Sequence, residues 1–394
     1  MDRNYSKITP EDAPWLTLPS ARAVCDAIAG GGHQIFYVGG CVRNALLRVP
    51  TSDVDMATSA TPAEVIFLVE AAGLKPVPTG IDHGTITVVS GGVGYEVTTF
   101  RRDVETDGRR AVVAFSTDIS DDARRRDFTM NALYADRDGQ VFDPLGGLDD
   151  LSDRRVRFIE NADDRIREDY LRTLRYFRFH AWYGDTSEGM DADALSAIGS
   201  NLEGLETLSS ERVGAEIHKL LDAVDPSTAL AAMAQTGVLG AILPGSDIRF
   251  ALLMIHGSDS LTLTPDWVGR LVSLGGVATP EKLRLSKAEQ RKYEAIRSAA
   301  YEGIPLLETA YEHGVGVATQ AYLIRCAIAE NIPDVLLVEG LKNAAAQIFP
   351  VSAKHLMPMY QGAALGSRLA LLKQAWIASK FKLSQKELLA LHDT

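Results

Sequence analysis

The sequence predicts an α+β fold in which a head of strands and helices is followed by a chain of helices. Short segments before about residue 100 alternate between apolar and polar side chains, as strands do. After about Leu220 the chain is rich in Ala and Leu at helical spacing, and prolines at intervals mark helix ends. We therefore expect a head at 1–150, a helical neck at 151–225, and a helical body and tail at 226–394.

The most informative segment is FYVGGCVRNALLRVPTSDVDMAT. It predicts a strand ending at Gly39 and Gly40, a short helix with Arg43, a polar turn, and a second strand that carries Asp53 and Asp55. Residues two apart on a strand point to the same side, so both carboxylates can reach one site. Two such anions beside a bare glycine backbone suit Mg²⁺ with a triphosphate. The pattern indicates nucleotidyl transfer, although either element alone is more often an ordinary turn.

Two later segments combine polar residues with helical spacing. In DDARRRDFTMNAL, Asp127 and Asn131 are four residues apart on a predicted helix and suit hydrogen bonding to a 2′-hydroxyl. In EDYLRTLRYFRFHAW, Asp169, Arg172 and Arg175 lie beside an apolar stripe. Such an Asp and Arg pair is most often a surface ion pair that stabilises by a few tenths of a kcal/mol.

Together these segments resemble the class II tRNA nucleotidyltransferase and poly(A) polymerase family of the DNA polymerase β-like nucleotidyltransferase superfamily. The likeness is carried by GG-x-VR-x-x-LL followed by D-x-D, by RRDFTxNA, by EDxLRxLRxxRF and by ER-x-x-x-E, and it spans Phe36 to Glu216. Asn44 departs from the family pattern where Asp is usual, and Arg48 where Gly commonly follows two leucines. The resemblance implies a polymerase β-like head with a mixed sheet, then an all-helical neck, body and tail.

The resemblance also implies a role for each polar set. Asp53 and Asp55 would bind two Mg²⁺ ions. Glu96 would be the third catalytic carboxylate, because HGTITVVSGGVGYEVTTF alternates like a hairpin whose second strand lies beside the one with the two aspartates. Residues expected to bind the nucleotide are Gly39, Gly40, Arg43, Arg126, Asp127, Asn131, Asp169, Arg172 and Arg175.

In this family the pair corresponding to Asp169 and Arg172 reads the incoming base, and the chemistry suits that role. A carboxylate accepts a hydrogen bond from the amino group of cytosine or adenine, and a guanidinium donates to the ring nitrogen. Uracil and guanine present a carbonyl oxygen where the amino group would be, so the carboxylate repels them. One pair of side chains can thus accept C and A without a nucleic-acid template.

The activity that the resemblance implies is addition of CCA to the 3′ end of tRNA from CTP and ATP, with release of pyrophosphate. Asp107 and Arg109 resemble a flexible loop that A-adding members keep and CC-only members lack. Alternatives within the family are A addition alone and poly(A) synthesis. Alternatives of another class are a non-catalytic RNA-binding protein and an enzyme for a small-molecule acceptor, and the intact Asp-x-Asp argues against a protein without catalytic activity.

Composition sets further expectations. No apolar run is long enough to span a membrane, and the N-terminus lacks a signal-peptide pattern, so we expect a cytoplasmic enzyme. Three separated cysteines offer neither a disulfide framework nor a zinc site. A net charge of −12 argues against RNA binding unless folding segregates the charges. From residue 101 to 178 the cationic side chains are 16 arginines and no lysine, which favours bidentate phosphate contacts.

Overall fold

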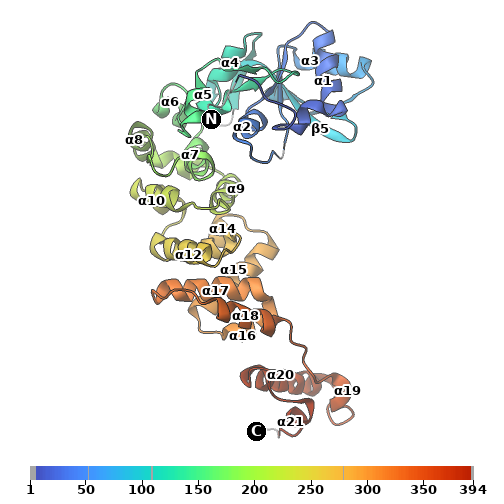
Figure 1. Cartoon of the computed structure of the whole chain (residues 1–394), viewed down its shortest axis with the longest axis vertical. Coiled ribbons are helices and arrows are strands. Elements are labelled where there is room, and N and C mark those ends of the chain that lie inside the picture. The colour runs from blue at the N-terminus through green and yellow to red at the C-terminus, as the bar shows by residue number, and fades with distance from the viewer. Residues whose placement is uncertain (1–5, 52, 108–109, 278, 392–394) are drawn as a thin grey trace. The chain divides into compact units, whose positions relative to one another are not determined.

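The computed structural model describes residues 6–51, 53–107, 110–277 and 279–391. Figure 1 shows the order of the elements along the chain. They form two compact units, one of Met1–Ser209 with Ala232–Ile242 and the other of Ser210–Ala231 with Leu243–Thr394. The three-part division at residues 150 and 225 remains a prediction. Within the described ranges, no helix has the length and apolar character needed to cross a lipid bilayer.

The first unit is built on a seven-stranded sheet with the strand order β3-β4-β5-β2-β1-β8-β9. All neighbouring pairs are antiparallel except β2 and β5, which are parallel, so the sheet is mixed and the predicted fold class is confirmed. A separate hairpin joins β6 to β7. The strands are β1 Ile35–Val38, β2 Met56–Thr58, β3 Lys75–Gly80, β4 Thr85–Ser90, β5 Val93–Thr99, β6 Arg101–Asp107, β7 Arg110–Phe115, β8 Tyr134–Ala135 and β9 Val141–Phe142.

The predicted hairpin between β4 and β5 is confirmed. Gly91 and Gly92 form its two-residue turn with φ of 57° and 80°. Positive φ at both turn positions matches the right-handed twist of the strands and is easy for glycine alone. The turn fixes the register of β4 against β5, with Val88 opposite Tyr95. On its other side β5 pairs in parallel with β2, with Met56 opposite Val97.

Strand β2 is shorter than predicted. It begins at Met56, so Asp53 and Asp55 lie in the segment that leads into the strand. The backbone is still held there, because Val38 donates a hydrogen bond from its amide to the Asp55 carbonyl at 3.0 Å. Aspartate is disfavoured inside strands, and this exposed end is where the sheet tolerates it.

Helices and short 3₁₀ turns surround the sheet. Helices α1 and α3 pack against each other and against β4. The helices of the first unit are η1 Pro14–Thr17, α1 Pro19–Gly30, α2 Gly40–Leu47, α3 Pro62–Ala71, η2 Ile81–His83, α4 Ile119–Arg124, η3 Thr129–Asn131, α5 Gly147–Ser152, α6 Ala162–Glu168, α7 Leu171–Tyr183, α8 Ala192–Ser200, η4 Leu202–Thr207 and α11 Val238–Ile242.

Two predicted helices differ from the structure. The segment 121–133 is not one helix: α4 ends at Arg124, and Phe128 is extended and forms a β-bridge with Phe158 before η3 begins. This interruption buries the Phe128 ring completely, which a continuous surface helix would not. The helix predicted from Glu168 starts at Leu171, because the backbone of Asp169 is extended between α6 and α7.

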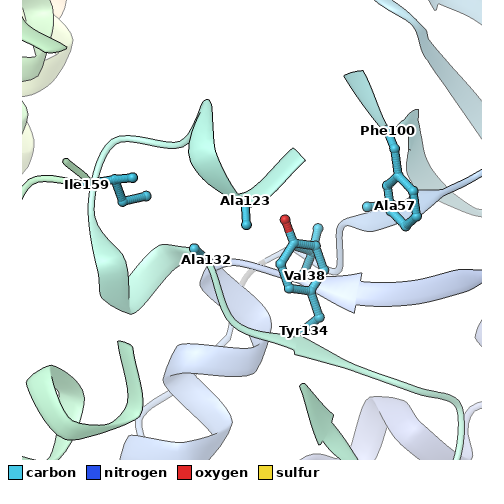
Figure 2. Close-up of a cluster of buried hydrophobic side chains, with 7 residues drawn as sticks. All are labelled: Val38, Ala57, Phe100, Ala123, Ala132, Tyr134 and Ile159. Carbon is cyan, nitrogen blue, oxygen red and sulfur yellow. The ribbon is translucent and has the colours of Figure 1, made fainter. Parts of the chain in front are cut away.

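A buried cluster joins these turns to the sheet (Figure 2). Tyr134 on β8 and Val38 on β1 pack with Ala123 of α4 and with Ala132, which follows η3. The positions of α4 and η3 are therefore set by apolar burial against the sheet. The remaining members of the cluster are Ala57, Phe100 and Ile159.

The second unit is helical in all of its described elements, as predicted. Two apolar clusters form its cores, one around α16, α17 and α18 and one around α20 and α21, and Phe381 packs against both. Helix α10 contributes residues to both units. The helices are α9 Ser210–Leu221, α10 Ser227–Gln235, α12 Ile248–Ser260, α13 Trp267–Leu274, α14 Thr279–Lys282, α15 Lys287–Tyr301, α16 Leu306–His313, α17 Val315–Ile328, α18 Val335–Ala345, α19 Ala353–Leu356, α20 Gly362–Ala378 and α21 Gln385–Leu389.

The segment DPLGGLDDL fixes η3 from one side. Asp143 accepts hydrogen bonds from the amides of Gly147 and Leu148 at 2.8 and 2.9 Å. The hydroxyl of Thr129 donates to Asp150 at 2.6 Å. Helix α5 approaches so closely that a Cβ on Gly147 would lie 2.3 Å from the Thr129 carbonyl oxygen. Glycine at this position is thus required by the close approach of two backbones.

We expect Gly147→Ala to lower the free energy of unfolding by about 3 kcal/mol, because the new methyl group must displace backbone atoms. The neighbouring Gly146→Ala is the matched control. Gly146 has a φ of 71° with open space around its Cβ position, so the substitution should cost only about 1 kcal/mol. Urea unfolding of the two variants measures the difference, and equal losses would contradict the packing argument.

Candidate active site

Three carboxylates lie around one cavity of about 860 Å³ in the first unit. Asp53, Asp55 and Glu96 all line it. Asp55 precedes Met56 and Glu96 precedes Val97, and because Met56 and Val97 are paired in a parallel register, the two carboxylates are neighbours across β2 and β5. The fold therefore brings together acidic residues that are more than forty positions apart in sequence.

Burial, with a further contribution from the neighbouring carboxylates, raises the pKa of Asp55 to about 6. Burial by the surrounding walls is the largest cause, followed by the negative charges of Glu96 and Asp53, while Arg126 acts in the opposite direction. The Asp55 side chain still reaches solvent. The negative charges of Glu96 and Asp53 beside Asp55 make this a site suited to a cation.

The carboxylates suit a divalent metal ion that takes some of its ligands from the protein and the others from a bound substrate and water. Among the described residues, no three metal-ligating side chains come close enough to enclose an ion by themselves. Mg²⁺ seldom uses such a cage: it keeps several waters and is held by one or two carboxylates together with substrate phosphates. Asp53 and Asp55 provide that number of ligands at the edge of an open cavity.

The loop between β1 and α2 brings bare backbone close to an arginine. Gly39 has a φ of 69° and is the N-cap of α2, whose first residue is Gly40. A Cβ on Gly39 would lie 3.3 Å from Nη1 of Arg126, and one on Gly40 would lie 3.7 Å from Nη2 of Arg43. Backbone amides at a helix start and two guanidinium groups beside them form a place where an anion binds readily.

Arg126 is held by residues that the sequence analysis did not single out. Its Nη2 donates to Asp122 at 2.9 Å and its Nε to the Tyr134 hydroxyl at 3.2 Å. Burial alone would lower the pKa of Arg126, but Tyr134 and Asp122 raise it. The same contacts, with Arg125, hold the pKa of buried Asp122 at about 2 against the effect of burial. The guanidinium is therefore a fixed positive charge.

Asp127 is the centre of a buried network. Its carboxylate accepts from Asn131 Nδ2 at 2.9 Å and from Arg175 Nε at 2.7 Å. Burial would raise the pKa of Asp127, yet Arg175 and Asn131 lower it to about 2. Asn131 in turn accepts a hydrogen bond from Arg43 Nη1. Asp127 and Asn131 are adjacent as predicted, but across a turn and not on a helix face, and they bond to each other. Their predicted binding of a ribose hydroxyl remains a prediction.

Arg43 is more enclosed than the sequence indicates. It is 6% exposed, donates to the Tyr183 hydroxyl at 2.8 Å, and lies over the Tyr183 ring at 4.0 Å and the Phe179 ring at 5.0 Å. Burial lowers the pKa of Arg43. Asn44, the unusual residue at this position, accepts from Arg43 Nη2 at 2.8 Å and donates to the Pro50 carbonyl at 2.7 Å. An aspartate has no donor for that second bond.

Asp169 and Arg172 lie at the junction of α6 and α7. The Asp169 carboxylate accepts from the Leu171 amide at 3.1 Å and so caps α7. Arg172 pairs with Glu168 at 2.5 Å and donates to the Arg125 carbonyl at 3.0 Å. That last bond ties α7 to the segment after α4, so the predicted base-reading residues are connected to the Arg126 cluster.

Of the predicted flexible-loop residues, only the backbone of Asp107 lies within the part of the chain that the structure describes. Asp107 is the last residue of β6, and its backbone lies opposite that of Arg110 in the register of β6 and β7. Gly108 and Arg109 lie outside the described residues. Of the functional residues that sequence reasoning missed, Asp122 had a usable indication, because an acidic residue three or four positions before two arginines on a helix is placed to pair with them. Tyr183 had none.

Comparison with known proteins finds relatives in both sequence and fold. The family described as “Poly A polymerase head domain” matches residues 35–157, and “Probable RNA and SrmB- binding site of polymerase A” matches residues 189–248. The “CCA-adding enzyme” of Streptococcus gordonii is 37% identical over 284 residues, which cover 70% of this chain and 69% of that protein. The mitochondrial “CCA tRNA nucleotidyltransferase 1” of Mus musculus is 42% identical over 201 residues, 51% of this chain and 46% of that protein. The chain thus spans about half the length of several curated relatives that it matches.

Solved structures show the same similarity over most of the chain. The Bacillus stearothermophilus CCA-adding enzyme in complex with CTP has a TM-score of 0.72 and 27% identity, over 92% of this chain and 93% of that chain. The Thermotoga maritima CCA-adding enzyme complexed with tRNA has a TM-score of 0.64 at 16% identity, over 93% of this chain and 92% of that one, and it shows the fold alone. The sequence and structural similarities together place the chain in the class II CCA-adding enzyme and poly(A) polymerase family.

Proposed function

We propose that this protein adds CCA to the 3′ end of tRNA, using CTP and ATP and releasing pyrophosphate. The observation that carries the proposal is the cavity lined by Asp53, Asp55 and Glu96 beside a glycine loop and the fixed cation Arg126. That arrangement supplies ligands for a metal, a place for phosphates and room for an acceptor. Relatives named for CCA addition support the choice among nucleotidyl transfer reactions.

Asp53 and Asp55 are the proposed ligands of a divalent metal, and Mg²⁺ is the ion that their oxygen donors suit. When bound, the metal would lower the pKa of the acceptor 3′-hydroxyl and neutralise charge on the phosphates. Glu96 is next to Asp55, where it can complete the metal site and accept a hydrogen bond from the attacking hydroxyl. These residues thus position the acceptor oxygen for in-line attack on the α-phosphate.

The remaining polar residues would hold the nucleotide. Backbone amides after Gly39 and the guanidinium of Arg126 suit the triphosphate. Asp127 and Asn131 are in reach of one another and suit a ribose hydroxyl, although both are already bonded within the protein. Arg43 and Arg175 bond to this pair, so we assign them mainly to its positioning. Asp169 and Arg172 are the proposed readers of the base.

Alternatives within the family are A addition alone and poly(A) synthesis. Loop residues Asp107 and Arg109 favour a site that adds A after CC, as the resemblance implies. A non-catalytic RNA-binding protein would have no need for three carboxylates around one cavity. An enzyme for a small-molecule acceptor would use the same carboxylates. It differs from the proposed enzyme in that it would transfer the nucleotide to a small molecule and not to RNA.

An incorporation assay tests the function directly. It combines the purified protein with Mg²⁺, tRNA lacking its CCA end, and each labelled nucleoside triphosphate in turn. We expect CTP and then ATP to be incorporated, and Asp53→Asn or Asp55→Asn to reduce the rate by about a hundredfold or more, since a lost metal ligand removes several kcal/mol of transition-state stabilisation. Glu70→Ala, at an exposed acid on α3, is the control. Incorporation of A alone, long poly(A) products, or no incorporation would each support a different alternative.

The carboxylate cluster predicts a pH dependence. Because the pKa of Asp55 is raised to about 6, this side chain becomes protonated as the pH falls through about 6 and then cannot bind a cation. In metal-free protein, a carbon-13 NMR titration of Asp55 should have its midpoint near pH 6. Glu96→Gln removes a neighbouring negative charge and should lower that midpoint. An unchanged midpoint in Glu96→Gln would show that the two carboxylates are not coupled.

The substitution Asp169→Asn distinguishes a role of Asp169 in reading the base from its role in capping α7. Asparagine still caps α7, so the melting temperature should stay within a few degrees of wild type. Its amide can also donate to the carbonyl oxygens of uracil and guanine, which a carboxylate repels. We therefore expect the preference of kcat/KM for CTP and ATP over UTP and GTP to fall by at least about tenfold. A variant that keeps wild-type preference would leave Asp169 with the cap alone.

A further inference from the structure

Arg43 is a buried cation whose hydrogen-bond partners are all uncharged. Its Nε and Nη2 donate to Oδ1 of Asn44 at 3.1 and 2.8 Å. Its Nη1 donates to Asn131, and Nη2 also donates to the Tyr183 hydroxyl. Among the residues that the structure describes, Arg43 forms no ion pair with a carboxylate. Burying a charge is costly unless an opposite charge lies beside it, so this environment is unusual for an arginine.

The carboxylate whose charge acts on Arg43, that of Asp127, already belongs to another arginine. Arg175 pairs with Asp127 at 2.5 Å. Burial and the positive charge of Arg178 lower the pKa of Arg43, while Tyr183 and Asp127 raise it. The contacts that hold Arg43 in place therefore do not neutralise its charge.

This charge lies beside the glycine loop. A Cβ on Gly40 would be 3.7 Å from Nη2 of Arg43. Gly40 is the first residue of α2, where backbone amides have no partner within the helix and the helix dipole is positive. A triphosphate bound at these amides would thus be the nearby negative charge that the protein itself does not give to Arg43.

The amide of Asn44 makes two bonds that a charged side chain does not make together. Its oxygen accepts from Arg43, which is only a donor, and its nitrogen donates at 2.7 Å to the Pro50 carbonyl, which is only an acceptor. An aspartate at this position would keep the first bond and lose the second. It would also place a negative charge within hydrogen-bond distance of the guanidinium and so neutralise Arg43.

We propose that Asn44 sets how strongly the site attracts the triphosphate, because it holds Arg43 in place and leaves its positive charge unneutralised. Asn44 acts through Arg43 and does not itself contact the nucleotide. The attraction is the same for CTP and ATP, since both have the same triphosphate. The inference rests on the proposed function, in which a nucleoside triphosphate binds at the glycine loop.

The substitution Asn44→Asp tests the proposal, with binding of inorganic triphosphate to metal-free protein measured by calorimetry. We expect the Kd to rise about tenfold, because the added negative charge repels the polyanion through the protein. The variant loses the bond to the Pro50 carbonyl and gains an ion pair with Arg43, so its melting temperature should stay within a few degrees of wild type. Weaker binding by a variant of unchanged stability is not explained by unfolding.

Two controls separate the charge of residue 44 from its hydrogen bonds. Asn44→Ala removes both amide bonds and adds no charge, so it should lower the melting temperature and keep the Kd for triphosphate within about threefold of wild type. Gln34→Glu adds the same charge at an exposed position just before β1, whose other end leads into the glycine loop. About five residues of extended chain, roughly 16 Å, separate Gln34 from Gly39, so this variant should bind triphosphate like wild type.

Steady-state kinetics with tRNA lacking CCA separates this inference from the function. Asn44→Asp should raise KM for CTP and for ATP by the same factor, about fivefold, and leave KM for the RNA unchanged. If wild-type protein incorporates nucleotides and Asn44→Asp keeps the wild-type Kd and KM, the role of Asn44 is wrong and the function stands. The role is also wrong if Asn44→Ala weakens triphosphate binding as much as Asn44→Asp does. If wild-type protein incorporates nothing on any RNA, the proposed function itself fails.

Discussion

The head depends on the burial of one carboxylate, that of Asp127. It is 8% exposed, and a charge so far from water must be bonded on every side. Arg175 of α7 and Asn131 of η3 provide those bonds, and Arg43 of α2 bonds to Asn131 in turn. Three elements that are distant in sequence therefore share one set of hydrogen bonds. Moving any of them would leave a buried charge without a partner, so the glycine loop at the start of α2 keeps a fixed position relative to α7.

Within this unit, aspartates have their pKa shifted in opposite directions, depending on their surroundings. Beside arginines, Asp122 and Asp127 have their pKa lowered to about 2 and serve as permanent counterions. Asp55, which is partly buried beside other carboxylates and bonded to no arginine in the described contacts, has its pKa raised to about 6, first by burial and then by the charge of Glu96. Asp122 and Asp127 have a structural role, since arginines already neutralise their charge. Asp55 has no such counterion among its described contacts, so its charge is available to a cation. This difference in surroundings distinguishes the catalytic candidates from the supporting acids, although all of them are carboxylates.

At the junction of α6 and α7, the residues that we propose as readers of the base also make contacts that hold the fold. Asp169 caps a helix, and Arg172 bonds to the Arg125 carbonyl and to Glu168. Arg125 also pairs with Asp122, which holds Arg126. A base contacting Asp169 and phosphates contacting Arg126 would thus be linked through a few bonds. Such continuity lets one rigid framework position both ends of a nucleotide, a requirement of reactions that depend on orientation.

The sequence alone determined what depends on local pattern and composition. Strand alternation and the paired glycines predicted the β4–β5 hairpin, and Ala- and Leu-rich spacing predicted the helical second unit. The motifs predicted a set of acids and arginines for the site, of which Asp53, Asp55 and Glu96 line one cavity, and the roles of the set remain a prediction. Only the tertiary structure decided the rest, because burial overrides local preference: Phe128 breaks a predicted helix to reach the core, and Asp53 and Asp55 lie before their strand. Neither the bond of Arg172 to the Arg125 carbonyl nor the enclosure of Arg43 by Tyr183 follows from spacing, since each partner is selected by how distant segments pack.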